Sequence, residues 1–145
     1  MMRFARVLFV LAVTFWAGGL VVVGGVVAPL VFRIVPAPAS ADAMTAVFRR
    51  FDTLSFGFAI AVAVAEAIFA RRAQVGGPDG TIRRVGAAIA TTLLFAEGLY
   101  LTPSIQTLHQ NGAIRGFGKA GLELERLHTF AERVSKLELL CLLVI

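Results

Sequence analysis

Residues Val7 to Phe32 read VLFVLAVTFWAGGLVVVGGVVAPLVF, a stretch without an ionisable side chain. The hydrocarbon core of a bilayer is about 30 Å thick, and a helix of about 20 apolar residues crosses it. This stretch is long enough to cross with some tilt. A secretory signal peptide has an apolar core of only about 7 to 15 residues, so the length argues against a cleaved leader. The stretch therefore predicts a transmembrane helix.

Three more segments of the 145-residue chain are candidates for membrane spans. Leu54 to Ala70 follows Asp52, and Val85 to Thr102 precedes Pro103, which we expect to end the third helix. The fourth segment covers about Leu127 to Ile145. The chain is 58% hydrophobic and 16% charged, and its mean hydropathy is +0.83, which is typical of integral membrane proteins. We predict an all-α four-helix membrane bundle.

Residues 41–52, between the first two spans, form an amphipathic segment. Apolar side chains recur at the helical spacing i, i+3, i+4 and i+7, and the charged residues lie off this stripe. The members of the stripe are Met44, Val47, Phe48 and Phe51. A short helix of this kind lies in the membrane interface. We therefore predict a separate interfacial helix that begins near Ser40.

The basic residues predict the orientation of the chain in the membrane. The second loop is short and holds four arginines: Arg71, Arg72, Arg83 and Arg84. Short loops rich in Arg and Lys stay in the cytoplasm, so we expect both termini there. The dominance of arginine over lysine, together with much alanine, glycine and valine, indicates a bacterium with a GC-rich genome, hence the inner membrane. The net charge of +5 fits contact with lipid headgroups rather than with nucleic acid.

Charged residues inside the spans cost about 2.5 to 3.5 kcal/mol each on insertion scales and need partners. Glu66 lies about one turn from the arginines of the second loop, and we expect it to pair with them. Glu97 lies about six residues, or about 9 Å, below the opposite surface. Arg133 lies at the same depth on the fourth span. We therefore predict an ion pair between Glu97 and Arg133.

Other polar residues follow one face of the fourth span. His128, Glu132 and Ser135 are spaced i, i+4 and i+7, and Glu132 can also pair with Lys136. His128 and Glu132, together with Glu97 and Arg133, could line a polar path. In the alternative interpretation, this charged segment lies on the membrane surface and the span begins near Leu137, but LELLCLLVI alone is too short to cross.

Small residues on the first span predict close packing against another helix. They are Gly18, Gly19, Gly24 and Gly25. Glycines let two backbones approach closely in membranes. These faces are more abundant than four mutually packed helices require. We therefore expect a partner subunit.

Four short motifs resemble those of a known family. They are FWAGGLVVVGGVVAPLVF in the first span, FRRFD before the second, YLTP at the end of the third, and RLHTFAERVSK at the start of the fourth. This pattern resembles the bacterial four-span family called domain of unknown function 4149, which includes relatives of eukaryotic transmembrane protein 205. The resemblance implies a four-helix membrane bundle and implies no known reaction. Its members tend to carry a serine and an asparagine after the histidine of the last helix, where this chain has Ala131 and Ser135 or Lys136.

The sequence predicts neither enzyme activity nor a cofactor nor a metal site. It has no Gly-rich phosphate loop, no CxxC and no HExxH motif. A copper site would need clustered histidine and methionine, and the chain has only His109, His128 and three methionines. His128 could be an axial ligand of a haem or chlorophyll, but we expect no second helical histidine beside it. A hydrogen-bonded structural role is therefore favoured for His128.

Two classes of function remain. The first is a non-enzymatic scaffold or accessory subunit of a larger membrane complex, for example a photosynthetic reaction centre or a respiratory assembly. It would bind lipid and other subunits through the glycine faces. The second is a small transporter with a polar path at Glu97, His128, Glu132 and Arg133.

Overall fold

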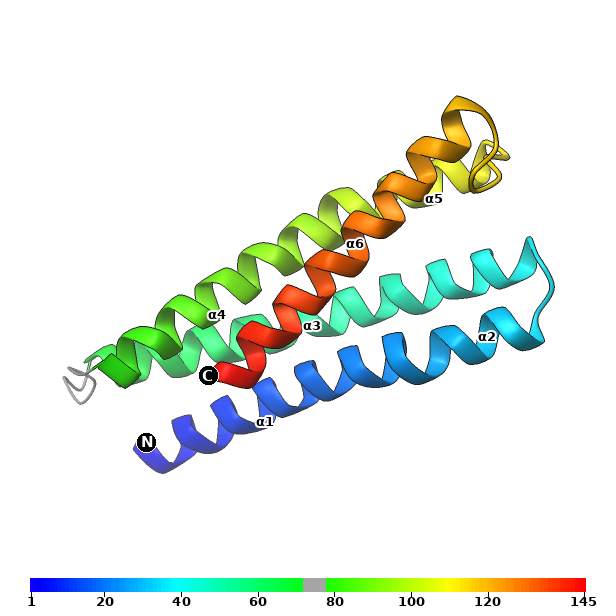
Figure 1. Ribbon diagram of the computed structural model, residues 1–145. Coiled ribbons are helices and arrows are strands. Elements are labelled where there is room, and N and C mark those ends of the chain that lie inside the picture. The colour runs from blue at the N-terminus through cyan, green and yellow to red at the C-terminus, as the bar shows by residue number, and fades with distance from the viewer. Residues whose placement is uncertain (72–77) are drawn as a thin grey trace.

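The computed structural model describes residues 1–71 and 78–145, and every regular element in this part of the chain is helical (Figure 1). The elements are α1 (Met2–Val22), η1 (Val23–Val27), α2 (Ala28–Ile34), α3 (Ala39–Arg71), α4 (Pro78–Ala96), η2 (Glu97–Leu101), α5 (Thr102–Gln110) and α6 (Gly118–Val144), where η marks a π-helical segment. Three continuous rods are long and apolar enough to cross a membrane: Met2–Ile34, Ala39–Arg71 and Gly80–Gln110. The protein is therefore a helical membrane protein, with α6 as a further helix beside these three rods.

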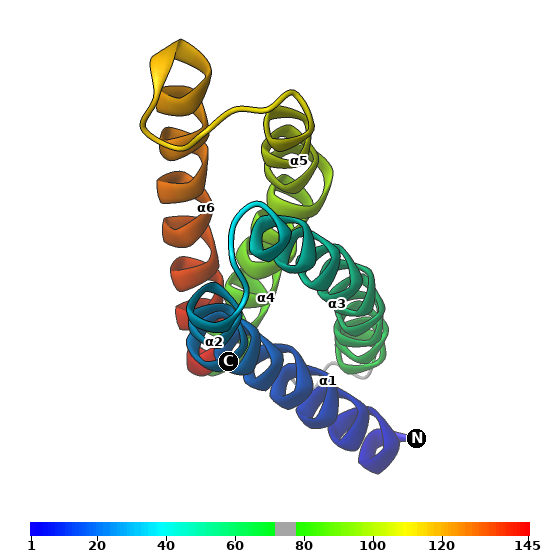
Figure 2. The same ribbon diagram turned by 90° about the vertical axis from the view of Figure 1, so that its right-hand side faces the viewer.

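The helices form two antiparallel pairs. The rod that begins with α1 packs against α3, and the rod that begins with α4 packs against α6 (Figures 1 and 2). Further contacts of α1 with α6 and of α3 with α4 join the pairs. Both chain termini lie at one end of the bundle, and the loops that follow α2 and α5 lie at the other (Figure 1). We call these the terminal end and the loop end.

The core has two apolar layers in which alanines alternate with larger side chains. The layer nearer the terminal end contains Ala5, Phe9, Ala12, Val62, Ala65, Phe69 and Ala87. The next layer contains Trp16, Ala17, Ala59, Ala90, Leu94 and Leu142. The alanines let the four helices approach closely, and the aromatic rings fill the space between them.

The predicted interfacial helix is not a separate element. Helix α3 is continuous from Ala39 to Arg71, so residues 41–52 and the second span form one rod. Neither proline nor glycine separates the two parts, and nothing else in the sequence breaks the helix there. The 33 residues of α3 measure about 50 Å at 1.5 Å per residue. Its amphipathic first turns therefore extend beyond a hydrocarbon core of about 30 Å.

The prediction that Pro103 ends the third helix is wrong. The rod continues through α5 to Gln110. A proline removes one backbone N–H and crowds the carbonyl four residues earlier, and the wider π-helical turn of η2 immediately before it relieves this crowding. In the first rod, η1 precedes Pro29 in the same way. As a result His109, which follows the predicted end of the third helix, lies on a helix.

Candidate functional site

Three acidic side chains from three helices meet in the interior of the bundle. Asp52 comes from α3, Glu97 from η2 and Glu138 from α6, and they are only 8%, 9% and 1% exposed. All three line one cavity of about 40 Å³. We call them the carboxylate cluster. The cavity has room for a few water molecules or one small cation.

Each member of the carboxylate cluster accepts a hydrogen bond from an uncharged donor. The Thr102 hydroxyl donates to Oδ2 of Asp52 at 3.0 Å. The Ser135 hydroxyl donates to Oε1 of Glu97 at 2.6 Å. The indole N–H of the fully buried Trp16 donates to Oε1 of Glu138 at 2.6 Å. The second oxygen of Glu138, Oε2, is buried and has no hydrogen-bond partner among the described residues.

The cavity has acidic groups and no described basic side chain in its lining. The remaining lining residues are Leu20, Val23, Gly24, Phe48, Phe51, Leu94 and Ser135. The three carboxylates interact electrostatically with one another. Several like charges that are close together in a low-dielectric interior repel strongly, so the cluster can be fully ionised only if a cation enters. The arrangement is therefore suited to bind protons or a small cation.

Both π-helical segments contribute to this cavity. Val23 and Gly24 of η1 lie on one side of it, and Glu97 is the first residue of η2. A π-helical turn inserts an extra residue and changes the direction of the following side chains, and such turns are frequent at functional sites. In this bundle they place Glu97 and an open backbone segment on the same cavity.

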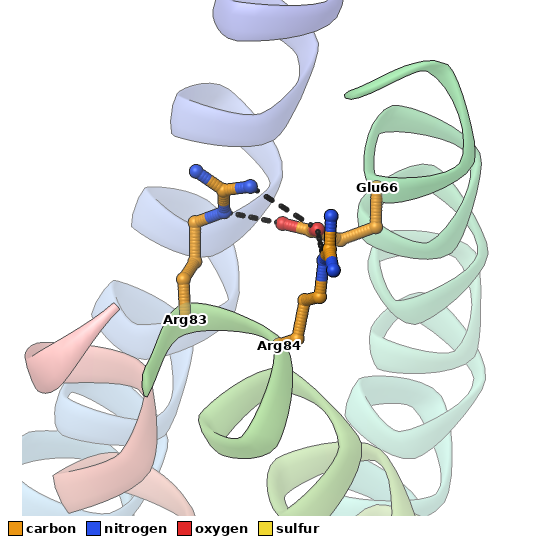
Figure 3. A network of polar contacts seen from close by, with 3 residues as sticks. All are labelled: Glu66, Arg83 and Arg84. Atoms are coloured by element: carbon orange, nitrogen blue, oxygen red, sulfur yellow. Dashed lines mark hydrogen bonds and ion pairs between the residues drawn. The ribbon is translucent and has the colours of Figure 1, made fainter. Parts of the chain in front are cut away.

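A second group of charges lies at the terminal end, where one carboxylate is paired with two arginines (Figure 3). The Nε of Arg83 forms a short ion pair with Oε1 of Glu66, and its Nη2 donates to Oε2 at 3.2 Å. The Nε of Arg84 lies 3.6 Å from the same Oε2. The guanidinium of Arg83 also lies over the rings of Phe69 and Phe9, at 4.7 and 5.5 Å from their centroids. The predicted pairing of Glu66 with the arginines after the second span is confirmed, although both partners lie on α4.

The predicted ion pair between Glu97 and Arg133 is wrong. Arg133 is exposed, and the polar partner of Glu97 on α6 is Ser135. The two α6 residues lie at nearly the same depth, but they are separated by about 200° around the helix axis. Depth along the helix alone therefore predicts the wrong partner for Glu97. Of the residues predicted to line a polar path, Glu97, His128, Glu132 and Arg133, only Glu97 lines the carboxylate cavity.

The other charges predicted on the fourth helix lie on its outer surface. Lys136 forms an i, i+4 ion pair with Glu132 at 2.6 Å, as predicted, and both side chains are well exposed. Every predicted site residue lies within the described ranges 1–71 and 78–145. Arg72, one of the four arginines used to predict the orientation, lies outside the described residues.

The glycines of the first rod differ in their surroundings. A side chain at Gly19 would collide with the ring of Phe51 on α3, so this glycine permits the close packing of α1 against α3. A Cβ atom at Gly18, Gly24 or Gly25 would meet no described atom within 4 Å. The predicted packing role within the chain thus applies to Gly19, whereas the other three glycines have open space beside them.

A family model, described as Domain of unknown function (DUF4149), matches residues 11–113 of the chain. The match covers most of the three apolar rods. The chain belongs to the DUF4149 family. No curated protein and no solved structure matches it.

In this DUF4149 protein, the matched region holds two members of the carboxylate cluster, Asp52 and Glu97. It also holds η1, η2 and His109. Glu138, with its neighbour Ser135, lies on α6 beyond the matched region. The carboxylate cavity therefore joins the family region to the last helix.

Sequence reasoning missed two members of the cluster. In the sequence, Asp52 marks the boundary of the second span, and Glu138 lies in the apolar segment LELLCLLVI. Glu138 does carry a signal, because it is an acid between leucines and lies three residues after Ser135, on the same helical face. Trp16 carried none, since a buried indole cannot be assigned a partner from spacing alone.

Two histidines meet at the loop end. His109 lies on α5 and His128 on α6, with Nε2 atoms 3.4 Å apart, ring centroids 5.6 Å apart and ring planes inclined at 64°. The expectation that no second helical histidine lies beside His128 is wrong, because α5 continues past Pro103. Both side chains are half-buried.

Proposed function

We propose that this DUF4149 protein is a small, non-enzymatic membrane transporter in which the carboxylate cluster takes up and releases protons. The observation that supports it most strongly is the buried set of Asp52, Glu97 and Glu138 around one cavity without a basic side chain in its described lining. Intramembrane acids are costly and are typical of proton and cation pathways. A purely structural role would favour pairing them with arginine, as in the Glu66 group.

The surroundings support access to the cluster from the loop end. Two apolar layers and the Glu66–Arg83–Arg84 group lie between the cavity and the terminal end. Toward the loop end, polar contacts continue from the bond between Thr102 and Asp52 to the contact of Arg49 with Gln106 at 3.4 Å. In this conformation the proposed site is closed toward the terminal end. Transport requires a second conformation in which that side opens.

Proton flux into proteoliposomes tests the proposal. The full chain is reconstituted, a potassium gradient with valinomycin drives proton entry, and an enclosed pH-sensitive dye reports it. We expect wild-type flux well above that of empty liposomes and a loss of more than about tenfold in Glu138→Gln and Glu97→Gln, because an amide cannot exchange the proton. Glu132→Gln is the matched control, since that acid lies on the same helix but is exposed. No flux in the wild type, or full flux in Glu138→Gln, would contradict the proposal.

An accessory-subunit role is the second candidate. It is favoured by the open surroundings of Gly18 and Gly25, where an added Cβ atom would meet no described atom within 4 Å. In that role another membrane subunit would pack on this face. Gly25→Leu should then abolish co-purification of the partner while the isolated protein stays folded. Gly19→Leu is the contrasting variant, since it should destabilise the isolated protein by its collision with Phe51.

We further propose that α6 is a fourth span and that both termini lie in the cytoplasm of a bacterial cell. The common position of the termini at one end of the bundle supports an even number of crossings (Figure 1). Thiol labelling of intact spheroplasts tests the orientation, after Cys141→Ser removes the native thiol. Asn111→Cys should react with an impermeant reagent and Arg3→Cys should not. The opposite pattern would reverse the orientation.

A further inference from the structure

The histidine pair at the loop end has a geometry of its own. The chain leaves α5, turns through residues 111–117 and enters α6, so that His109 and His128 face each other across two helices. Gly112 and Gly116 adopt positive φ angles of 76° and 79° in this turn, a conformation that glycine adopts without strain. The fold thus brings two imidazoles together from positions 19 apart in sequence.

The distance between the two Nε2 atoms favours a shared ligand. Hydrogen bonds from protein N–H groups have donor–acceptor distances of mostly about 2.9 to 3.0 Å. Two imidazole nitrogens, each about 2.0 to 2.1 Å from one tetrahedral metal ion, are about 3.3 to 3.4 Å apart. The observed separation is 3.4 Å. It is therefore long for a direct hydrogen bond and agrees with the spacing of two nitrogen ligands on one ion.

We propose that His109 and His128 form a binding site for a divalent transition-metal ion of the zinc and copper(II) class. Neutral imidazole nitrogen is a ligand that suits these ions. The described residues contain no group of three possible ligands, so water occupies the remaining positions. An open site of this kind exchanges its ion readily. It is suited to sensing or passing on a metal rather than to holding a permanent structural one.

Charged groups around the pair set its affinity. Arg115, in the turn, acts electrostatically on His128 and forms a weak ion pair of 3.9 Å with Glu125. On the α3 side, Asp42 and Arg49 line a cavity of about 180 Å³ together with His109. Through this cavity an ion and its water ligands can reach His109 at the loop end. The positive charge of Arg115 weakens cation binding, so its removal should strengthen it.

Zinc titration of the untagged full-length protein in detergent, followed by calorimetry, tests the site. We expect one zinc per chain in the wild type and no comparable binding of magnesium, which prefers oxygen ligands. Loss of groups that merely orient a metal ligand typically weakens binding about 10- to 100-fold, so His109→Gln and His128→Gln should weaken it at least tenfold. Arg115→Gln should tighten binding a few fold. Copper(II) electron paramagnetic resonance should show coupling to two nitrogens in the wild type and to one in either variant.

A cysteine variant separates metal binding from a structural hydrogen bond. His109→Cys removes the imidazole but supplies a thiolate, which is a good zinc ligand, so zinc binding should persist. His109→Gln keeps a hydrogen-bonding side chain and should lose the zinc. Thermal unfolding with and without zinc shows whether each variant is folded, because a ligand that binds only the folded state raises Tm. Wild-type protein that binds no zinc, or glutamine variants that bind as well as the wild type, would overturn the proposal. Neither result depends on proton flux through the carboxylate cluster.

Discussion

The half-buried carboxylate of Glu66 and the three buried acids of the carboxylate cluster have opposite kinds of partner. Near the terminal end, Glu66 is paired with the guanidinium groups of Arg83 and Arg84. The guanidinium of Arg83 also lies over two aromatic rings. In the carboxylate cluster, a threonine, a serine and an indole donate hydrogen bonds to the three acids. Arginines thus lie on the helices of this bundle, but no described arginine lines the cavity.

This contrast separates a structural use of charge from a chemical one. A carboxylate that is paired with arginine holds its charge and fixes the position of two helices. A carboxylate with neutral donors can gain or lose a proton at a smaller cost in lost contacts. The predictions below test whether the two groups differ in this sense.

The largest loss of stability is expected from Trp16→Phe. The change removes the donor to Glu138 and leaves space in the core, and we expect a loss of about 2 to 4 kcal/mol in the free energy of unfolding. Reversible unfolding by SDS in mixed micelles measures it. The same change in a Glu138→Met background should cost less, because no buried carboxyl is then left without its donor. An equal cost in both backgrounds would show that the hydrogen bond adds nothing.

Glu66→Gln should destabilise the protein by about 1 to 3 kcal/mol. The change leaves two arginines without their counter-charge, and the loss stays below that of a fully buried pair because the Arg84 side chain is 44% exposed. The same SDS titration measures it. Glu123→Gln, an exposed acid on α6, is the control and should have no measurable effect. A Glu66 variant as stable as the wild type would show that the pairing of Glu66 with the arginines does not stabilise the fold.

Glu138→Gln should change stability by less than about 1 kcal/mol, or raise it. The amide oxygen can still accept the bond from Trp16, and one of three mutually repelling acids is removed. The opposite responses of Glu66 and Glu138 to the same chemical change sharpen the comparison. If Glu138→Gln is as destabilising as Glu66→Gln, the cluster is a structural element and the proposed transport site loses its main support.

The smallest effect is expected in a double-mutant cycle between Glu97 and Arg133. The two side chains do not meet, so Glu97→Gln and Arg133→Gln should add within about 0.5 kcal/mol. The corresponding cycle with Glu66→Gln and Arg83→Gln should show a coupling above about 0.5 kcal/mol, because those side chains are in contact. A clear coupling of Glu97 with Arg133 would place α6 in a different rotation about its axis.

The sequence predicts levels along the membrane better than directions around each helix. The first three apolar runs lie in the three rods that qualify as spans, and Glu66 was paired correctly, because the rise of 1.5 Å per residue fixes depth within a straight helix. The partner of Glu97 was not, because each residue also turns the side chain by about 100°, and the rotation of α6 is set by packing that involves Trp16 and Leu142. The charged residues of α6 also keep it out of the set of helices that qualify as spans by hydropathy.

The histidine pair could not be predicted for a different reason. It depends on the continuation of the third rod through Pro103, and therefore on a π-helical turn that no local propensity indicates. Once α5 reaches Gln110, a turn of seven residues returns the chain to α6 and the two rings meet. The predicted end of the third helix at Pro103 therefore excludes the contact between His109 and His128.

The bond between Trp16 and Glu138 gives the protein a built-in optical reporter. The chain contains a single tryptophan, and its indole N–H donates to a member of the carboxylate cluster. Indole emission responds to a charge placed next to the ring, so the natural fluorescence of the unlabelled protein should follow the charge on Glu138. Binding of a proton or cation in the cavity should then change the emission wavelength or intensity of Trp16, and this change can be followed in real time in a reconstituted membrane.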